Sequence, residues 1–336
     1  MKNLTRMTTL VIVAGLITAG LAVGPVFGSE SAAKDEADAS QKAVLVTGAS
    51  TGIGRKITEL LAASGVFVYA GARKEKDLKE LDAMDNVQSI RLDVTIQEDI
   101  DAAVETISDE GRGLYGLVNN AGVAILAPLI EVEESELDFI FDVNIYGPYR
   151  ISKAFSPLII ESKGRITTIS SISGILSGTF FGPYSMSKHA MEAYSDSLAR
   201  EMGKFDVKVS VVEPGNYTSA IGTTLKKRMD AQGIDLEDSL YQEEMQAIVD
   251  RVGDRSQHKE PDEVAEAVYH ALFDPMPKMR YMVVPNQKEA EWTIRKAIQE
   301  LVELNQDHAF SYDRDALIKM LDEAMAATPK MPMHRR

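Results

Sequence analysis

Short apolar runs alternate with amphipathic stretches between residues 42 and 285. Seven runs have the length and the β-branched or aromatic content of strands, at residues 43–46, 65–72, 87–94, 114–118, 165–169, 207–213 and 280–284. Between them, apolar residues recur at helical spacing at residues 55–64, 96–109, 133–160 and 261–273. This alternation predicts an α/β fold with one doubly wound parallel sheet and helices on both faces.

The N-terminal region has a different pattern. Residues 8–28 contain no charge and follow Lys2 and Arg6, which is typical of a signal peptide or a membrane anchor, so we assign residues 1–28 to such a segment. Residues 29–41 form a polar, acidic tether without apolar periodicity. We therefore expect a protein that is membrane-associated through residues 8–28, or exported if the segment is cleaved.

Two further regions lack strand patterns. Residues 216–260 are charged and rich in Met, and we expect helices there that form a lid over the substrate. Residues 286–336 form a C-terminal helical extension, with helical patterns at 287–304 and 313–326. The apolar face of residues 287–304 could pack on the core, form an oligomer contact or lie on a membrane, and we favour packing on the core.

Charge and composition exclude several kinds of site. The formal net charge is −15 and the pI is about 4.9, which argues against a nucleic-acid partner. Cysteine is absent, so disulfides, zinc–thiolate sites and cysteine nucleophiles are excluded. The five histidines have no metal-ligand spacing, and we expect no metal site.

A glycine-rich loop follows the first predicted strand and precedes a helix. It contains Gly48, Ser50, Thr51, Gly52, Ile53 and Gly54. Glycines allow the backbone to approach a pyrophosphate, and the N-terminus of the following helix offers free N–H groups and a partial positive charge. The strand–loop–helix order therefore predicts a Rossmann-type dinucleotide site.

A second candidate site lies near residue 184. If this segment is helical, Tyr184 and Lys188 share one face, because residues four apart are neighbours on a helix. A nearby cation favours a phenolate over a phenol, whose pKa is ordinarily ~10, so Tyr184 could act as an acid/base. Ser171 follows a predicted strand and precedes Tyr184 by thirteen positions.

A strand followed by a Ser, and a Tyr-x-x-x-Lys motif that begins thirteen positions after this Ser, together resemble the active site of the short-chain dehydrogenase/reductase family. The Thr-Gly-x-x-x-Gly-x-Gly spacing of residues 47–54 and the Asn-Asn-Ala-Gly element at 119–122 are also similar to the family's motifs. The resemblance covers about residues 42–285. Residues 191–219 look most like the branch that contains retinol, 17β-hydroxysteroid and 3-hydroxybutyrate dehydrogenases.

The resemblance implies a catalytic tetrad of Asn144, Ser171, Tyr184 and Lys188. Ser171 would polarise the carbonyl oxygen, and Tyr184 would exchange the hydroxyl proton. Lys188 would favour the phenolate and bind the nicotinamide ribose. Asn144 would kink its helix and hold a water molecule in a proton relay; a plain buried, hydrogen-bonding Asn is the alternative.

The resemblance also assigns cofactor contacts outside the glycine-rich loop. These are Asp93 and Val94 at the adenine; Asn119, Ala121 and Gly122 after the fourth strand; Tyr184 and Lys188; and Pro214, Gly215 and Thr218 over the nicotinamide. Arg73 follows the second strand, where an arginine accommodates a 2′-phosphate and a carboxylate selects NAD. We therefore expect NADP as the preferred cofactor, with NAD as the alternative.

These features predict an NAD(P)-dependent oxidoreductase for a small hydrophobic alcohol or carbonyl substrate, steroid-, retinoid- or hydroxyacyl-like, in a homo-oligomer. A non-catalytic NAD(P)-binding protein is the first alternative, but the complete tetrad argues against it. A nucleotide-sugar epimerase with the same Tyr–Lys pair fits the glycine spacing and chain length less well.

Overall fold

The computed structural model describes residues 41–219, 221–232, 236–253 and 258–327. The chain divides into two units, Met1–Ser40 and Gln41–Arg336, and all described residues belong to the second. The predicted signal or anchor segment, and the tether up to Ser40, lie outside the described residues.

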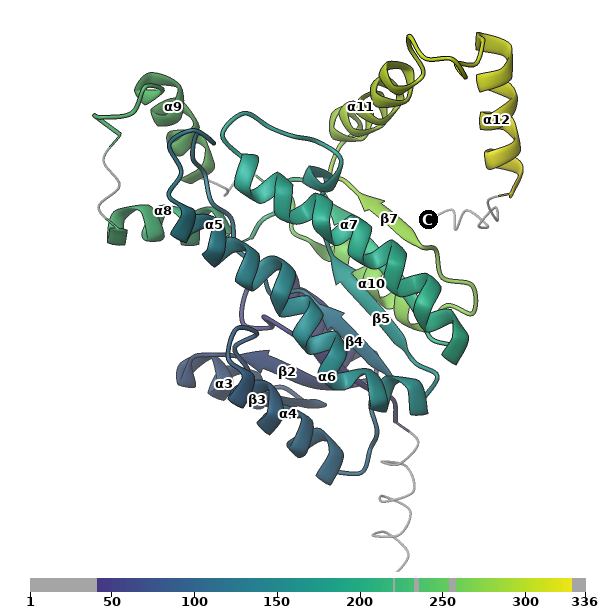
Figure 1. Cartoon of the computed structure of the whole chain (residues 1–336). Helices are drawn as coiled ribbons and strands as arrows, with labels where there is room; N and C mark the ends of the chain where they lie inside the picture. The colour runs from purple at the N-terminus through teal and green to yellow at the C-terminus, as the bar shows by residue number, and fades with distance from the viewer. Residues whose placement is uncertain (1–40, 220, 233–235, 254–257, 328–336) are drawn as a thin grey trace, which may run out of the picture. The chain divides into compact units, whose positions relative to one another are not determined.

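Seven parallel strands form one sheet in the order β3-β2-β1-β4-β5-β6-β7 (Figure 1). The strands are β1 (Ala43–Val46), β2 (Phe67–Ala72), β3 (Val87–Arg91), β4 (Gly116–Asn119), β5 (Arg165–Ile169), β6 (Lys208–Pro214) and β7 (Arg280–Val283). The strand order reverses direction between β1 and β4. In such sheets, ligands bind at the carboxyl ends of the strands beside this switch point.

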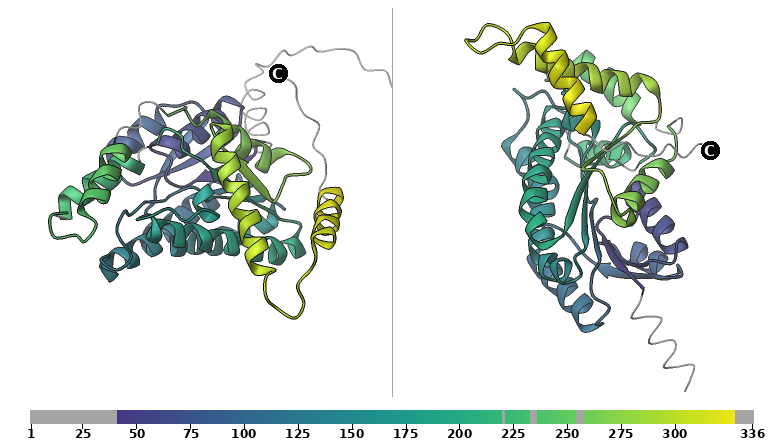
Figure 2. Two further views of the ribbon diagram at one scale, coloured as in Figure 1. Left: turned by 90° about the horizontal axis from the view of Figure 1, so that it is seen from above. Right: turned by 90° about the vertical axis from the view of Figure 1, so that its right-hand side faces the viewer.

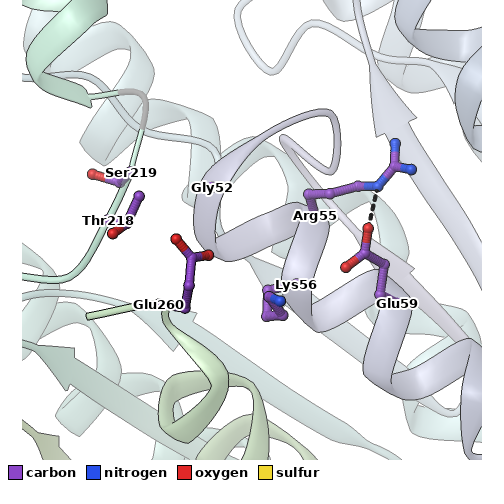
Figure 3. Close-up of a pocket in the computed structure, with 7 residues that line it drawn as sticks. All are labelled: Gly52, Arg55, Lys56, Glu59, Thr218, Ser219 and Glu260. Atoms are coloured by element: carbon purple, nitrogen blue, oxygen red, sulfur yellow. Dashed lines mark hydrogen bonds and ion pairs between the residues drawn. The ribbon is translucent and has the colours of Figure 1, made fainter. Parts of the chain in front are cut away.

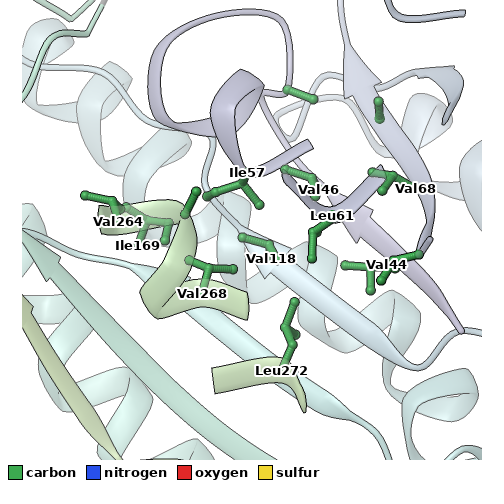
Figure 4. Packing of buried hydrophobic residues seen from close by; sticks show 14 of the residues in the cluster. Val44, Val46, Ile57, Leu61, Val68, Val118, Ile169, Val264, Val268 and Leu272 are labelled. Carbon is green, nitrogen blue, oxygen red and sulfur yellow. The ribbon is translucent and has the colours of Figure 1, made fainter. Parts of the chain in front are cut away.

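The buried strand residues alternate between the two faces of the sheet. Val44 and Val46 belong to one apolar cluster, whereas Ala43 and Leu45 belong to the other. Helices α2 (Gly52–Ala63) and α10 (Asp262–Phe273) cover the first face, and their side chains meet on the strands (Figure 4). Helices α4 (Gln97–Asp109), α6 (Gly147–Glu161) and α7 (Gly182–Met202) cover the second, so the sheet lies between two helical layers (Figure 2). The predicted fold class is confirmed.

Helix α3 (Glu75–Asp82) also packs on the first face, through Leu81. The remaining helices lie outside these layers or at their ends. They are α5 (Glu134–Phe141), α8 (Ile221–Gln232), α9 (Gln242–Gly253), α11 (Gln287–Leu304) and α12 (Arg314–Ala327), with short 3₁₀ turns η2 (Ile172–Gly174) and η3 (Gly203–Phe205). Helices α8 and α9 occupy the region predicted as a lid. None of the described helices is both long and apolar enough to span a membrane.

The helix predicted for residues 133–160 is interrupted. A π-helical turn, η1 (Asp142–Tyr146), separates α5 from α6. The amide of Asn144 bonds the backbone N–H and C=O of Val123, and these contacts hold the side chain away from its own helix. π-Helical turns within α-helices often occur at functional sites.

The prediction that residues 287–304 pack their apolar face on the core is wrong. Only Glu289 and Thr293 are buried in α11. Large apolar side chains of α11 are about half exposed or more, including Trp292 at 49%, Ile298 at 54% and Leu304 at 77%. Its helical periodicity therefore does not report contact with the core.

Candidate active site

The loops after β1 and β4 are tied together at the switch point. Asn120 donates its side-chain amide to the carbonyls of Thr47 (2.9 Å) and Gly48 (3.1 Å). The hydroxyl of Thr47 accepts the backbone N–H groups of Asn120 and Ala121, each at 3.0 Å. These contacts fix the glycine-rich loop against the end of β4.

The start of α2 suits a pyrophosphate. The helix begins at Gly52, three residues earlier than predicted, so Gly52 and Gly54 lie in its first turn. The side chain of Thr51 does not cap the helix, and the first turn of α2 has no acidic residue. The backbone N–H groups of this turn therefore stay available to an anion. A Cβ at Gly54 would lie 2.3 Å from the Gly48 carbonyl oxygen, so only glycine permits this tight turn.

A pocket of about 290 Å³ joins this turn to the loop after β6 (Figure 3). Its lining is Gly52, Arg55, Lys56, Glu59, Thr218, Ser219 and Glu260. The hydroxyl of Thr218 donates to the His258 carbonyl at 2.7 Å. Two predicted cofactor residues from distant segments, Gly52 and Thr218, therefore line one pocket.

Arg73 and Asp93 lie together at the ends of β2 and β3. Arg73 Nη1 is 3.4 Å from Asp93 Oδ2, and the arginine side chain is 62% exposed. Burial raises the pKa of Asp93, but bonds from Thr95 and the charge of Arg73 outweigh it and lower the pKa overall. Asp93 therefore holds an exposed guanidinium where Rossmann folds bind the adenosine ribose.

Asn119 is the last residue of β4, and its side chain is tied to α6. Its side chain is 3% exposed and donates to Ser152 Oγ at 2.9 Å, on the α6 side of the sheet. Among the described residues its Oδ1 has no hydrogen-bond partner, and the contact of Asn119 with a cofactor stays a prediction. The neighbouring Ala121 is half-buried and Gly122 is exposed beside the switch point.

The predicted tetrad residues come from three segments: Asn144 from η1, Ser171 from the end of β5, and Tyr184 and Lys188 from α7. Asn144 is 1% exposed and donates to Ser187 Oγ at 3.0 Å, and Ser187 donates to the Tyr184 carbonyl at 2.7 Å. A Cβ at Gly122 would lie 3.4 Å from Asn144 Oδ1 and 3.8 Å from Lys188 Nζ. Asn144 and Lys188 thus flank the same exposed glycine.

Lys188 is a buried cation beside Tyr184. Its Nζ donates to the Ile169 carbonyl at 3.0 Å and lies 5.6 Å from the centroid of the Tyr184 ring. Burial lowers the pKa of Lys188 to about 8, although the charge of Glu192 opposes this shift. The ammonium is therefore held at the end of β5 with few compensating charges.

Ser171 links β5 to the loop after β6. Its hydroxyl accepts the Ser173 N–H at 3.1 Å and faces the Pro214 carbonyl at 3.4 Å. Ser171 is 8% exposed, and Tyr184 lies in the first turn of α7, which begins at Gly182. The geometry thus gathers Ser171, Tyr184, Lys188 and Asn144 at the carboxyl ends of β4, β5 and β6.

Comparison with known proteins agrees with this architecture. The family profile described as short chain dehydrogenase matches residues 42–230, more than half of the chain. The chain belongs to the short-chain dehydrogenase/reductase family. It is therefore an oxidoreductase that acts on CH–OH donors with a nicotinamide cofactor.

Two curated relatives and one solved structure show how far this similarity extends. Mouse mitochondrial D-beta-hydroxybutyrate dehydrogenase is 35% identical over 267 residues, which cover 72% of this chain and 77% of the relative. Human retinol dehydrogenase 16 is 33% identical over 71% of this chain and 80% of its own length. A short-chain dehydrogenase from Streptomyces avermitilis superposes with a TM-score of 0.67 and 28% identity, over 86% of this chain and 99% of the other.

An acidic cluster lies behind the tetrad of this dehydrogenase. Glu192 on α7 and Glu213 on β6 both lie 3.3 Å from Arg280 Nε, and Asp196 pairs with the same guanidinium at 2.9 Å. Burial, then the charge and hydrogen bond of Glu192, raise the pKa of Glu213 against the effect of Arg280. Glu213 therefore keeps its proton to a higher pH than an ordinary carboxyl.

Glu213→Gln is expected to flatten the dependence of stability on pH. With a raised folded pKa, the native state binds more protons than the unfolded state, so wild-type stability falls as pH rises from ~4.3 through the raised pKa. The substitution removes that slope. Urea unfolding across this range would measure it, with exposed Glu161→Gln as the control. Parallel curves for wild type and Glu213→Gln would contradict the raised pKa of Glu213.

Three residues in this site had no role assigned from sequence. Thr47 opens the motif of residues 47–54 and Ser187 precedes Lys188, but only the structure shows their bonds to Asn120 and Asn144. Glu213 had a detectable signal, since a carboxylate ending an apolar strand is unfavourable without partners. Its partner Arg280 lies 67 positions later and could not be paired with it from sequence.

Proposed function

We propose that this dehydrogenase transfers a hydride between NADP(H) and an alcohol or carbonyl compound with an apolar body. The observation that carries the proposal is the grouping of Ser171, Tyr184 and Lys188 beside the Asn144 π-turn, at the strand ends next to the α2 N-terminus. The cofactor, when bound, supplies hydride exchange at C4 of its nicotinamide ring.

In the proposed reduction, Ser171 donates a hydrogen bond to the substrate carbonyl oxygen. Tyr184 gives its phenolic proton to that oxygen as the carbon receives the hydride, so that a C–H and an O–H bond form. In the oxidation, the Tyr184 phenolate accepts the hydroxyl proton. Lys188 favours the phenolate by its charge, and Asn144 and Ser187 hold the Tyr184 helix in register.

Apolar contacts near the lid support a hydrophobic substrate. Leu126, Leu225, Met229 and Met245 form a separate cluster, with Phe180 and Phe181 packed against it. These two phenylalanines directly precede the Tyr184 helix. The lid helices therefore meet the loop before Tyr184 through apolar side chains. Both curated relatives described above are named for alcohols, hydroxybutyrate and retinol.

Cofactor binding followed by a turnover screen would test the proposed function. We expect the purified full-length protein to bind NADPH more tightly than NADH and to reduce apolar ketones or aldehydes. Failure of the folded protein to bind either cofactor would contradict the proposal. Binding without turnover on any carbonyl or alcohol of the screen would instead support the non-catalytic alternative.

Arg73→Ala is expected to weaken NADPH binding by roughly 10- to 100-fold and to leave NADH binding nearly unchanged. The reason is the loss of a charge-assisted hydrogen bond to a 2′-phosphate, which NADH lacks. Isothermal titration with both cofactors would measure the difference. Lys76→Ala on α3 is the control, because it removes an exposed cation that pairs with Glu80. Equal losses for both cofactors would contradict the assignment of NADP preference.

A further inference from the structure

The carboxylate of Glu289 leaves the first turn of α11 to contact a distant loop. Asn286 caps the helix, accepting the Glu289 N–H at 3.1 Å and donating to Glu289 Oε1 at 2.9 Å. In a capping box the carboxylate at this position returns to the N–H of the capping residue. Here Oε2 instead accepts the backbone N–H of Asn216 at 2.8 Å, from a residue 73 positions earlier.

The burial of this carboxylate is unusual. Glu289 is 6% exposed, and among the described residues no Lys, Arg or His forms an ion pair with it. A buried charge is unfavourable unless hydrogen bonds compensate it. Two N–H donors and the positive end of α11 supply that compensation. Since Asn286 already caps the helix, helix stability alone does not account for burying the charge.

Gly215 leaves just enough room for this contact. A Cβ at Gly215 would lie 2.2 Å from Glu289 Oε2 and 3.0 Å from Val284 Cγ1. The Gly215 N–H donates to the Val283 carbonyl at 2.8 Å. The loop is therefore enclosed by the end of β7 and the first turn of α11, and a side chain at position 215 would displace the carboxylate.

The far side of the loop is fixed independently. Tyr217 donates its hydroxyl to Glu263 Oε2 at 2.5 Å, and the Thr218 N–H donates to the Lys259 carbonyl at 2.9 Å. Pro214 at the near end faces Ser171 through its carbonyl. Between these two ends, the Asn216 N–H has Glu289 as its partner.

We propose that Glu289 is a positioning residue, through which the C-terminal helix α11 sets the backbone of residues 214–218 against the cofactor. The inference rests on the proposed function, in which Pro214, Gly215 and Thr218 contact the nicotinamide half of NADP(H). It gives the extension after β7 an effect on cofactor binding and on turnover that acts through the backbone of residues 214–218.

Hydrogen exchange and cofactor titration of the full-length protein would test this role. In Glu289→Ala we expect amide exchange of residues 215–218 to accelerate on the order of 10- to 100-fold, and NADPH to bind correspondingly more weakly. Glu289→Gln keeps an acceptor oxygen and should retain most of the binding. Glu291→Ala is the matched control, because its carboxylate is half-exposed on the same helix and pairs with Arg295.

Gly215→Ala provides a second route to the same contact. Because its Cβ displaces the Glu289 carboxylate, the double variant Gly215→Ala/Glu289→Ala should bind NADPH no more weakly than the weaker single variant. Additive losses would overturn a shared contact.

Three further outcomes would overturn the proposal and distinguish its failure from that of the proposed function. Wild-type exchange in Glu289→Ala would show that the contact does not hold the loop. Faster exchange with unchanged NADPH binding and turnover would reduce Glu289 to a structural role. If wild-type protein binds neither NADPH nor NADH, the proposed function itself fails, whatever the exchange data show.

Discussion

Replacing Tyr184 with phenylalanine is expected to lower kcat by on the order of 10²- to 10⁴-fold while leaving NADPH affinity nearly unchanged. The substitution removes one hydroxyl, which is the proton donor and acceptor of the proposed reaction, and general acid–base groups contribute about that much. The ring stays, so the packing of α7 beside Lys188 is preserved. Steady-state kinetics on a substrate from the screen, with NADPH titration, would separate the two effects.

Tyr149→Phe provides the control for this experiment. Tyr149 is 47% exposed on α6, so losing its hydroxyl should change neither kcat nor NADPH affinity. Wild-type turnover in Tyr184→Phe would rule out Tyr184 as the acid/base. A loss of NADPH binding equal to the loss of kcat would indicate damage to the cofactor site rather than to proton transfer.

Several elements were predictable because their signals are local. The first and fifth strands, β1 and β5, have the predicted bounds, since short β-branched runs between turn residues leave little choice of register. The order of strands and helices was sufficient to predict the parallel sheet. The kink at Asn144 was expected only from the family resemblance, because helical periodicity does not show that its partner Val123, 21 positions earlier, interrupts the helix.

Helix α11 could be predicted as a helix, but its environment could not. Its amphipathic period is the same whether the apolar face meets the core or not, so periodicity could not decide between the three interpretations. The structure leaves Trp292, Ile298 and Leu304 exposed and buries Glu289 instead. The buried carboxylate gives no periodic signal, because its partner Asn216 is set by tertiary structure.

In the candidate site, too, residues in local motifs could be predicted, whereas contacts between distant segments could not. Ser171, Tyr184 and Lys188 could be selected from sequence because they lie on two adjacent segments at a fixed spacing. The charges around Lys188 could not, since Glu192, Glu213 and Arg280 come from α7, β6 and β7 and meet only in the folded sheet. Among these residues Glu192 opposes the lowering of the Lys188 pKa by burial, and Glu192 itself pairs with Arg280.

Lys188→Met is expected to lower kcat by about as much as Tyr184→Phe does. Unlike Tyr184→Phe, it should also weaken NADPH binding and change the pH dependence of stability. Burial lowers the pKa of Lys188 from 10.5 to about 8. At neutral pH the buried ammonium therefore lowers the free energy of unfolding by on the order of 3 kcal/mol, because the charge is better solvated in the unfolded chain. Methionine has a similar length without the charge. Removing the charge should raise the free energy of unfolding, and loss of the hydrogen bond to the Ile169 carbonyl should offset part of this increase.

The slope of stability against pH separates the charge effect from the lost hydrogen bond. Between pH of about 8 and 10.5, the unfolded chain keeps the Lys188 proton and the folded chain releases it. Wild-type stability should therefore rise with pH in this window relative to Lys188→Met, at up to about 1.4 kcal/mol per pH unit. Urea unfolding at several pH values would measure it, with exposed Lys153→Met as the control, whose curve should parallel wild type. Parallel curves for wild type and Lys188→Met would mean that Lys188 titrates at its ordinary pKa. In that case, placing the Lys188 ammonium beside Tyr184 would not lower the stability of the fold.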